Sequence, residues 1–312
     1  MKILLIRTLA AALVMTLPSI SAPSQNTIYQ ADWCRKLPRP EYSRLERVAD
    51  PDSWFQTYRV APGVFALYEA HQAEEVISFL IVGRRQALLF DTGMGIAPIR
   101  PLVERLTRLP VIVVNSHSHP DHVGGNHEFA DVRALDLPYT RQHERGFNHA
   151  EVAEEVQPEN ICGALPAGFV PANYAILPWK VAHRITNGTK IALGGRTLEI
   201  MVLPGHTPDA IALLDRDHRQ LFVGDTFYPG PIWLFAPETD WRAYKRSVAR
   251  LAGMAPSLQR LFPAHNVPVA SPEVLLRLRN AAAEIDSGKL KPVMLPGGRK
   301  EYRFDGFSIL LR

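Results

Sequence analysis

The chain has 312 residues, of which 46% are hydrophobic and 21% are charged, and its formal net charge is +4. This is the composition of an ordinary globular protein, and it excludes a disordered, collagen-like or disulfide-dense chain. The charge balance is too small to indicate a nucleic acid as partner, so we expect none.

Residues 1–22 have the pattern of a secretory signal peptide. Lys2 and Arg7 accompany an apolar run, Leu9–Leu17, which ends at a proline and small residues. The run is far shorter than the ~20 residues that cross a bilayer, and no other segment is long and apolar enough to do so. We therefore expect export to a bacterial periplasm or out of the cell, with an N-terminal extension at residues 23–55.

The sequence contains two cysteines, Cys34 and Cys162. In an oxidising compartment they could pair and close a long loop, which would add about 4 kcal/mol of stability through chain entropy. The sequence does not show whether their Cα atoms meet. A disulfide and two free thiols both stay open at this point.

Strand-like runs and helical stretches alternate after the N-terminal extension, in two similar halves. In the first half the expected strands are Tyr58–Val60, Val64–Tyr68, Val76–Val82, Gln86–Phe90 and Val111–Val114, and the expected helix is 97–107. In the second half the expected strands are Lys190–Leu193, Leu198–Leu203, Ile211–Asp215, Leu221–Val223 and Leu261–Pro263, and the expected helices are Trp241–Ala252 and Val274–Asp286. Two such halves bury both sheets when they pack face to face. The sequence therefore predicts an α/β fold, a four-layer αββα sandwich, over residues 56–312.

Residues 140–180 do not follow this alternation. They are rich in proline and contain scattered aromatic side chains, so we expect an insertion, and a lid over a substrate is one interpretation. Four apolar side chains, Phe169, Trp179, Trp233 and Phe235, suggest a small-molecule substrate with an apolar portion. The same four side chains are equally compatible with a hydrophobic core.

The loop after the run Val111–Val114 carries four side chains of the kinds that bind metals: His117, His119, Asp121 and His122. The first two histidines are one residue apart, so in an extended backbone both point the same way. The aspartate and the third histidine follow after a proline turns the chain. Four candidate ligands thus converge at the end of one strand, where a loop can expose them.

Three later residues have matching surroundings. His206, Asp225 and His265 each follow an apolar run and lie in a loop marked by glycine or proline. Seven candidate ligands are too many for one tetrahedral zinc, which takes four in a closed site or three plus water in a catalytic one. They suit two metal ions that share a carboxylate.

These residues resemble the signature of the metallo-β-lactamase superfamily of binuclear hydrolases, His-x-His-x-Asp-His followed by separate His, Asp and His, over about residues 60–270. The resemblance implies two divalent ions, most commonly Zn²⁺, with iron or manganese as alternatives. It assigns the first ion to His117, His119 and His206, the second to Asp121, His122 and His265, and the bridge to Asp225. Asp91, in an Asp-Thr-Gly turn, resembles the carboxylate that orients a ligand histidine in this family.

The resemblance also implies a mechanism. Two divalent cations lower the pKa of a bridging water and polarise a carbonyl or phosphoryl oxygen, and Asp121 then accepts or steers the proton. A serine nucleophile is not indicated, because the sequence lacks a Gly-x-Ser-x-Gly motif. We therefore expect an exported metal-dependent hydrolase.

The substrate is indicated by residues near the expected bridge. Asp225 argues against a true β-lactamase, which generally has cysteine or serine there. The spacing Asp225-x-x-Tyr228 resembles lactone-cleaving and thioesterase-like members, in which the tyrosine contacts the substrate carbonyl or the leaving oxygen. Tyr228 is thus a candidate catalytic residue, although it could simply pack against its neighbours.

We therefore expect cleavage of an ester-type bond, in a lactone or a thioester. A β-lactam hydrolase of the same superfamily and a non-catalytic metal-binding module are the alternatives. A redox member with a flavin domain is not favoured, because the chain is short after His265. The sequence does not indicate an oligomeric state.

Overall fold

The computed structural model describes residues 33–48 and 54–312. The expected signal peptide at residues 1–22 and the first part of the expected N-terminal extension lie outside the described residues. Among the helices that are described, none combines the length and apolar character needed to cross a bilayer.

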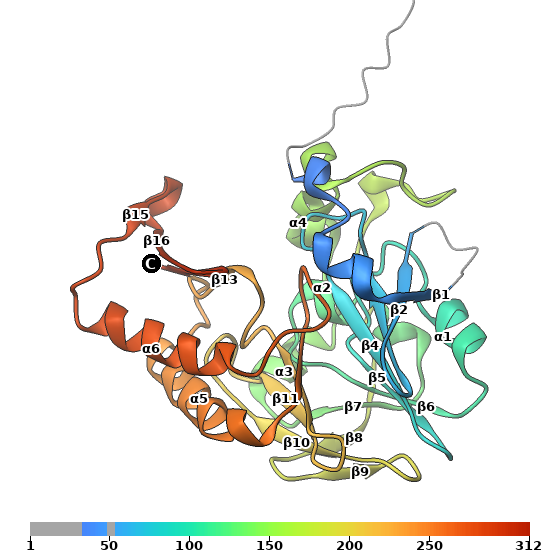
Figure 1. Cartoon of the computed structure of the whole chain (residues 1–312). Coiled ribbons are helices and arrows are strands. Elements are labelled where there is room, and N and C mark those ends of the chain that lie inside the picture. Colours follow the sequence, from blue (N-terminus) through green and yellow to red (C-terminus); the bar gives the residue numbers. More distant parts are fainter. Residues whose placement is uncertain (1–32, 49–53) are drawn as a thin grey trace, which may run out of the picture.

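Two large β-sheets form the centre of the molecule (Figure 1). The first has eight strands in chain order: β1 (Glu46–Val48), β2 (Gln56–Ala61), β3 (Val64–Tyr68), β4 (Ile77–Val82), β5 (Ala87–Phe90), β6 (Val111–Val114), β7 (Val132–Leu135) and β8 (Val181–Ile185). The second has the order β14 (Arg260–Pro263), β12 (Gln220–Gly224), β11 (Ile211–Asp215), β10 (Thr197–Val202) and β9 (Lys190–Ala192). Strands β5 to β8 are parallel, as are β12 and β14, and the other pairs in these sheets are antiparallel.

Helices cover the outer faces of the two sheets: α1 (Arg100–Leu106) lies on the first, and α5 (Trp241–Met254) and α6 (Val274–Asp286) lie on the second. Three short helices lie in the connections between strands β6 and β8: α2 (Pro120–Val123), α3 (Pro138–His143) and α4 (His149–Val152). Helix α5 begins where Asp240 accepts a hydrogen bond from the backbone N–H of Ala243, and it buries Tyr244, Val248 and Leu251 at helical spacing. Together with α6 it packs on the second sheet, as Figure 1 shows.

The main core lies between the two sheets. Phe79 and Phe90 of the first sheet contact Phe222 of the second, and all three are fully buried. Separate apolar clusters lie under α1 and under α5 with α6. This order of layers confirms the expected αββα sandwich.

The structure adds strands that the sequence pattern did not indicate. A third sheet has the order β13 (Gly230–Trp233), β17 (Phe307–Leu311), β16 (Lys300–Phe304) and β15 (Val293–Met294). Its buried side chains, Ile232 and Ile309 among them, extend the core beneath α5 and α6. The N-terminal extension contributes the edge strand β1.

The insertion at residues 140–180 packs on the outer face of the first sheet. Phe147, Tyr174 and Trp179 are buried there, and Phe169 packs against the same cluster. Of the four apolar side chains that suggested a substrate pocket, Phe169 and Trp179 thus belong to the core.

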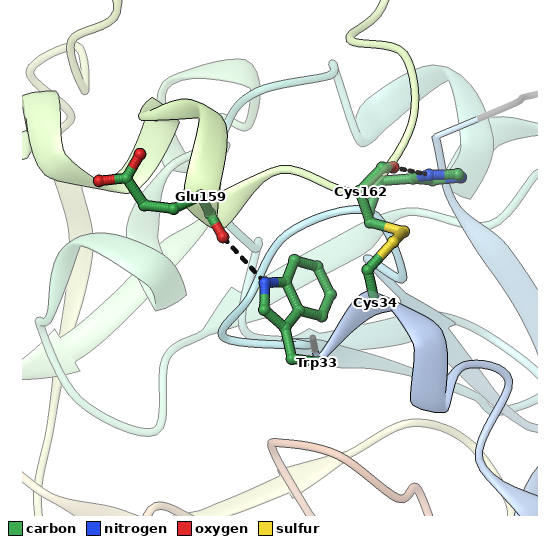
Figure 2. The surroundings of a disulfide bond; sticks show 5 residues. Trp33, Cys34, Glu159 and Cys162 are labelled. Carbon is green, nitrogen blue, oxygen red and sulfur yellow. Dashed lines mark hydrogen bonds between the residues drawn. A yellow bond between two sulfur atoms is a disulfide. The ribbon is translucent and has the colours of Figure 1, made fainter. Parts of the chain in front are cut away.

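A disulfide joins the N-terminal extension to the insertion. Cys34, in the 3-10 turn η1 (Cys34–Lys36), is bonded to Cys162, and their Cα atoms are 5.6 Å apart. Figure 2 shows Trp33 beside this bond, with its indole N–H donating to the carbonyl oxygen of Glu159 at 2.9 Å. The two segments, far apart in sequence, are therefore held together at two points.

Strand direction brings the candidate ligands to one edge. The carboxyl ends of β5 and β6 in the first sheet lie next to those of β12 and β14 in the second. Hydrogen bonds join the two sheets there: Ile211 N–H donates to Ser116 O at 2.7 Å, and Ile77 N–H donates to Ala264 O at 2.7 Å. The loops that follow these strands form the candidate site.

Candidate metal centre

Three imidazole nitrogens form the first cluster of possible ligand atoms. His117 Nε2 lies 2.9 Å from His119 Nδ1. His206 Nε2 lies 3.2 Å from His117 Nε2 and 3.1 Å from His119 Nδ1. Tetrahedral ligands at the Zn–N distance of about 2.0–2.1 Å are roughly 3.4 Å from one another. The three nitrogens are therefore spaced almost as one small divalent ion requires.

A second cluster lies beside the first. Asp121 Oδ2 is 2.9 Å from His122 Nε2, and His265 Nε2 is 3.3 Å from His122 Nε2 and 3.5 Å from the carboxylate oxygen. Asp121 and His122 occupy the first turn of α2, which begins with Pro120. Proline suits this position because its fixed φ matches the helix. The loop thereby turns from the strand-like His117–His119 stretch into a helix that redirects the next two side chains.

Asp225 lies between the two clusters. Its Oδ1 is 3.2 Å from His265 Nε2 and 3.4 Å from His122 Nε2, whereas its Oδ2 is 3.6 Å from His206 Nε2. Oδ1 is buried and has no hydrogen bond that satisfies both distance and angle. A buried carboxylate oxygen without a donor is costly unless it meets a cation. The donor set thus fits two divalent ions that share this carboxylate.

Each histidine of the site has a second partner on the far side of its ring. Three rings face carbonyl or hydroxyl oxygens: His206 Nδ1 lies 2.9 Å from Trp233 O, His265 Nδ1 2.6 Å from Glu74 O, and His117 Nδ1 3.0 Å from Ser116 Oγ. The other two face carboxylates, as His122 Nδ1 lies 3.0 Å from Asp91 Oδ2 and His119 Nε2 2.8 Å from Glu238 Oε1. Such partners orient a ligand ring and fix which nitrogen is free.

The structure thus places all seven residues that the sequence singled out as ligands within one small volume, and Asp91 directly behind His122. Sequence reasoning missed Glu238 and Asp209. Asp209 is buried and accepts hydrogen bonds from Ser118, Thr140 and Thr207, so it links the loops that carry His119 and His206. Neither carboxylate belongs to a recognisable motif.

Close backbone packing supports the ligand loops. A Cβ at Gly224 would lie 2.5 Å from Ser116 Cβ, and its φ of +51° suits glycine. A Cβ at Gly124 would lie 2.2 Å from the carbonyl carbon of Met94. Glycine is therefore required directly before Asp225 and shortly after His122.

Burial and charge divide the histidines into two kinds. Burial holds the pKa of His117 well below its usual range and lowers the pKa of His206 to about 4. Burial also opposes charge on His265, but Asp225 and Asp121 outweigh it and raise the pKa to about 9. The pKa of His122 lies well above its usual range because Asp121, Asp225 and Asp91 outweigh its desolvation.

A cavity of about 190 Å³ opens onto the two clusters. Trp233 and Phe235 line it together with Glu74, Glu155 and Tyr228, so these two aromatic residues take the place that the sequence suggested for them. The Tyr228 ring packs on the ring of His265 at 4.8 Å between centroids, and its hydroxyl oxygen accepts a hydrogen bond from Trp233 N–H at 3.1 Å. Burial raises the pKa of Tyr228 above its ordinary value, so the phenol keeps its proton near neutral pH.

Curated relatives share substantial parts of this chain. The acyl-coenzyme A thioesterase MBLAC2 of Gallus gallus is 25% identical over 225 residues, which cover 68% of this chain and 80% of the relative. The human protein of the same name is 27% identical over 207 residues, covering 62% of this chain and 71% of the relative. A hydroxyacylglutathione hydrolase of Cyanothece sp. is 30% identical over 154 residues, covering 47% of each.

Solved structures share the fold. A metallo-beta-lactamase family protein of Thermus thermophilus has a TM-score of 0.53 at 19% identity, covering 74% of this chain and 80% of that one. The sec-alkylsulfatase Pisa1 of Pseudomonas sp. has a TM-score of 0.54 at 18% identity, covering 74% of this chain and 42% of that one. The family model described as the metallo-beta-lactamase superfamily matches residues 74–265, a span that includes both clusters. The chain therefore belongs to the metallo-beta-lactamase superfamily and is a metal-dependent hydrolase.

Proposed function

We propose that this protein hydrolyses a thioester, with a lactone as the second candidate substrate. The observation that carries the proposal is the position of Asp225, whose two oxygens face two separate groups of ligand atoms. That arrangement suits a binuclear site, and a binuclear site suits attack of water on a carbonyl.

We propose that the ligands divide between two ions, in agreement with the distances between their donor atoms. His117, His119 and His206 would hold one, Asp121, His122 and His265 the other, and Asp225 both. We propose zinc, because imidazole and carboxylate donors in groups of three are typical of it. When bound, the ions supply a Lewis acid for the substrate oxygen and make hydroxide available near neutral pH.

The protein side chains supply orientation and proton handling. His122 and His265 hold the pKa of Asp121 at about 2 in spite of its burial, so this group is a carboxylate near neutral pH and can accept a hydrogen bond from the attacking water. Tyr228 keeps its proton, and it is one of the residues that line the cavity. It can therefore donate a hydrogen bond to the carbonyl or to the leaving atom of the substrate.

Three observations favour a thioester. The relatives include proteins named acyl-coenzyme A thioesterase and others named hydroxyacylglutathione hydrolase. Trp233 and Phe235 give the cavity an apolar wall suited to an acyl group. Asp225 stands where true β-lactamases generally have cysteine or serine, which makes a β-lactam the less favoured substrate.

We further propose that the protein is exported, to a periplasm or to the outside. The pattern of residues 1–22 supports this. The Cys34–Cys162 disulfide agrees with it, because structural disulfides persist mainly in oxidising compartments. N-terminal sequencing of the protein from its native host tests the proposal: a mature chain that begins after the apolar run is expected, and an intact Met1 in cytosolic protein would contradict it.

A substrate panel tests the activity. Zinc-loaded protein is compared on an acyl thioester, an acyl-homoserine lactone, a carbapenem and a phosphodiester, with Asp225→Asn as the variant that keeps the side-chain size and removes its charge. We expect the highest kcat/KM on the thioester, and loss of that activity in the variant. A carbapenem or phosphodiester preferred over both esters would overturn the proposal.

A further inference from the structure

A larger cavity, of about 630 Å³, adjoins the one at the metal centre. The two share Glu74, Glu155, Tyr228, Trp233 and Phe235 as wall residues, and the larger one also reaches His265. Because the same side chains line both, the two cavities lie side by side. The size of the larger one is that of a site for a drug-sized molecule, about 300–1,000 Å³. The cavity at the clusters alone is too small for that.

The outer wall of this larger cavity comes from the N-terminal extension. Trp33, Lys36 and Arg39 line it, together with residues of the loop around β13 and of the insertion. This wall lies outside the span 74–265 that the family model matches. It is therefore a feature of this chain that the family assignment does not explain.

Two anchors hold that wall in place. At one end the Cys34–Cys162 disulfide and the hydrogen bond from Trp33 Nε1 to Glu159 O join it to the insertion, as Figure 2 shows. At the other end Arg39 donates to both oxygens of the Glu75 carboxylate, at 2.8 and 2.5 Å, and to Asn266 Oδ1 at 2.7 Å.

The second anchor also reaches the catalytic region. Asn266 follows His265 directly, and it donates to the carbonyl oxygen of Pro229, the neighbour of Tyr228, at 2.6 Å. The extension is therefore tied to the same loops that carry a candidate ligand and a candidate catalytic residue. A segment fixed in this way presents a constant surface to whatever enters the cavity.

The chemistry of the walls indicates what fits. Trp33 is partly exposed and Trp233 is 43% exposed, so both offer aromatic surface to the cavity, as Phe235 does. Charged residues of both signs line this cavity: Lys36 and Arg299 are positive, and Glu154 is negative. Charge thus does not select a ligand, whereas aromatic surface favours an apolar or planar group.

The geometry points to a specificity site: the disulfide-anchored segment Trp33–Arg39 binds an extended apolar or planar part of the substrate while its carbonyl lies at the metal centre. This inference rests on the proposed thioesterase activity. Trp33 is the central contact, and the Cys34–Cys162 bond is the device that positions it. The extended part could belong to the acyl chain or to the thiol leaving group, because the same aromatic surface suits either.

The test uses the zinc-loaded full chain and three thioesters: a small acyl group on a small thiol, a long acyl chain on the same small thiol, and a small acyl group on a large thiol that carries an aromatic ring. Trp33→Ala and the double variant Cys34→Ser/Cys162→Ser are compared with wild type. Trp241→Ala is the control, because Trp241 is a partly exposed tryptophan that bonds Asp286 and lines neither cavity.

We expect Trp33→Ala to raise KM about tenfold for at least one extended thioester and to leave kcat and KM for the small one unchanged. The double cysteine variant is expected to show the same rise in KM for the extended thioester alone. Trp241→Ala is expected to leave KM unchanged for all three thioesters. The extended substrate that responds shows which side of the thioester occupies the cavity. Equal effects on the small and extended thioesters, or no difference between Trp33→Ala and Trp241→Ala, would overturn the inference.

A binding measurement separates this inference from the proposed activity. Thioether analogues of the extended substrates cannot be hydrolysed, so calorimetry reports their Kd whether or not the protein is a thioesterase. Wild type is expected to bind an extended analogue about tenfold more tightly than Trp33→Ala does. Equal Kd values would contradict the specificity site, whereas absent hydrolysis of every thioester would contradict the proposed function.

Discussion

The buried carboxylate of Asp91 lies directly behind the ring of His122. Its Oδ2 is 3.0 Å from His122 Nδ1, and its Oδ1 accepts a hydrogen bond from Ser116 N–H at 2.6 Å. The two side chains are 1% and 0% exposed, so water does not compete for this contact. The contact leaves Nε2 of the ring as the atom that faces Asp121, His265 and Asp225.

Replacing Asp91 is expected to weaken metal binding without removing a ligand. In Asp91→Ala the ring of His122 loses its partner, and affinity for zinc should fall about 10- to 100-fold. Competition against a chromophoric chelator measures it. The exposed Asp217→Ala is the matched control and should bind as wild type does. An unchanged affinity in Asp91→Ala would show that the carboxylate does not orient the ligand.

Replacing Asp225 is expected to lower the number of bound ions. Its two oxygens lie next to different clusters, so Asp225→Ala removes one ligand atom from each. We expect fewer than two zinc ions per chain after dialysis and a fall of kcat by at least about 100-fold. Elemental analysis and a thioester assay check the two parts. Two tightly held ions in the variant would contradict a shared carboxylate.

Zinc binding is expected to release protons from one cluster. Near pH 7 the metal-free His265, with a pKa of about 9, carries a proton that a metal ion must displace. Affinity at the Asp121–His122–His265 cluster should therefore rise with pH through about pH 9. His206, with a pKa of about 4, is already neutral at pH 7 and releases none.

Calorimetry in two buffers of different ionisation enthalpy measures this release. At pH 7 the Asp121–His122–His265 cluster should release at least about one proton, and His265→Gln should reduce the release by about one. The same titration above pH 9 should show less. Zinc binding with no proton release at pH 7 would refute the charge states assigned to His265 and His122.

The disulfide is expected to stabilise the fold. Cys34 and Cys162 are 128 residues apart, and closing a loop of that length restricts the unfolded chain by about 4–5 kcal/mol. Denaturant unfolding of the metal-free Cys34→Ser/Cys162→Ser protein should show a correspondingly lower free energy of unfolding. Wild type and the double variant are both measured without metal, because bound zinc adds its own stability. Equal midpoints would mean that the bond does not constrain the unfolded state.

The sequence predicted the sandwich and the positions of the candidate ligands because those features are local. Apolar runs such as Val111–Val114 indicate buried strands by themselves, and the ligand types stand directly at their ends. The role of Asp91 came from the resemblance to the family, which the Asp-Thr-Gly turn carries. The assembly of the ligands into two clusters came from the same resemblance, since spacing alone cannot bring His117 and His265 together.

The remaining features depend on contacts between distant segments. Glu238 and Asp209 are single carboxylates whose partners, His119 and Ser118, lie far away in the chain. The strand Lys300–Phe304 is mostly charged, so its sheet partners rather than its pattern determine it. The position of Trp33 in a cavity wall could not be predicted either. It depends on the Cys34–Cys162 disulfide, and the sequence did not show whether that bond forms.

The most direct test of the whole account is a zinc titration of metal-free protein, with bound metal and thioester hydrolysis followed together. Activity should be absent without metal, rise with added zinc, and reach its maximum at two ions per chain. Full activity in demonstrably metal-free protein, or a maximum already reached at one ion per chain, would contradict a binuclear site.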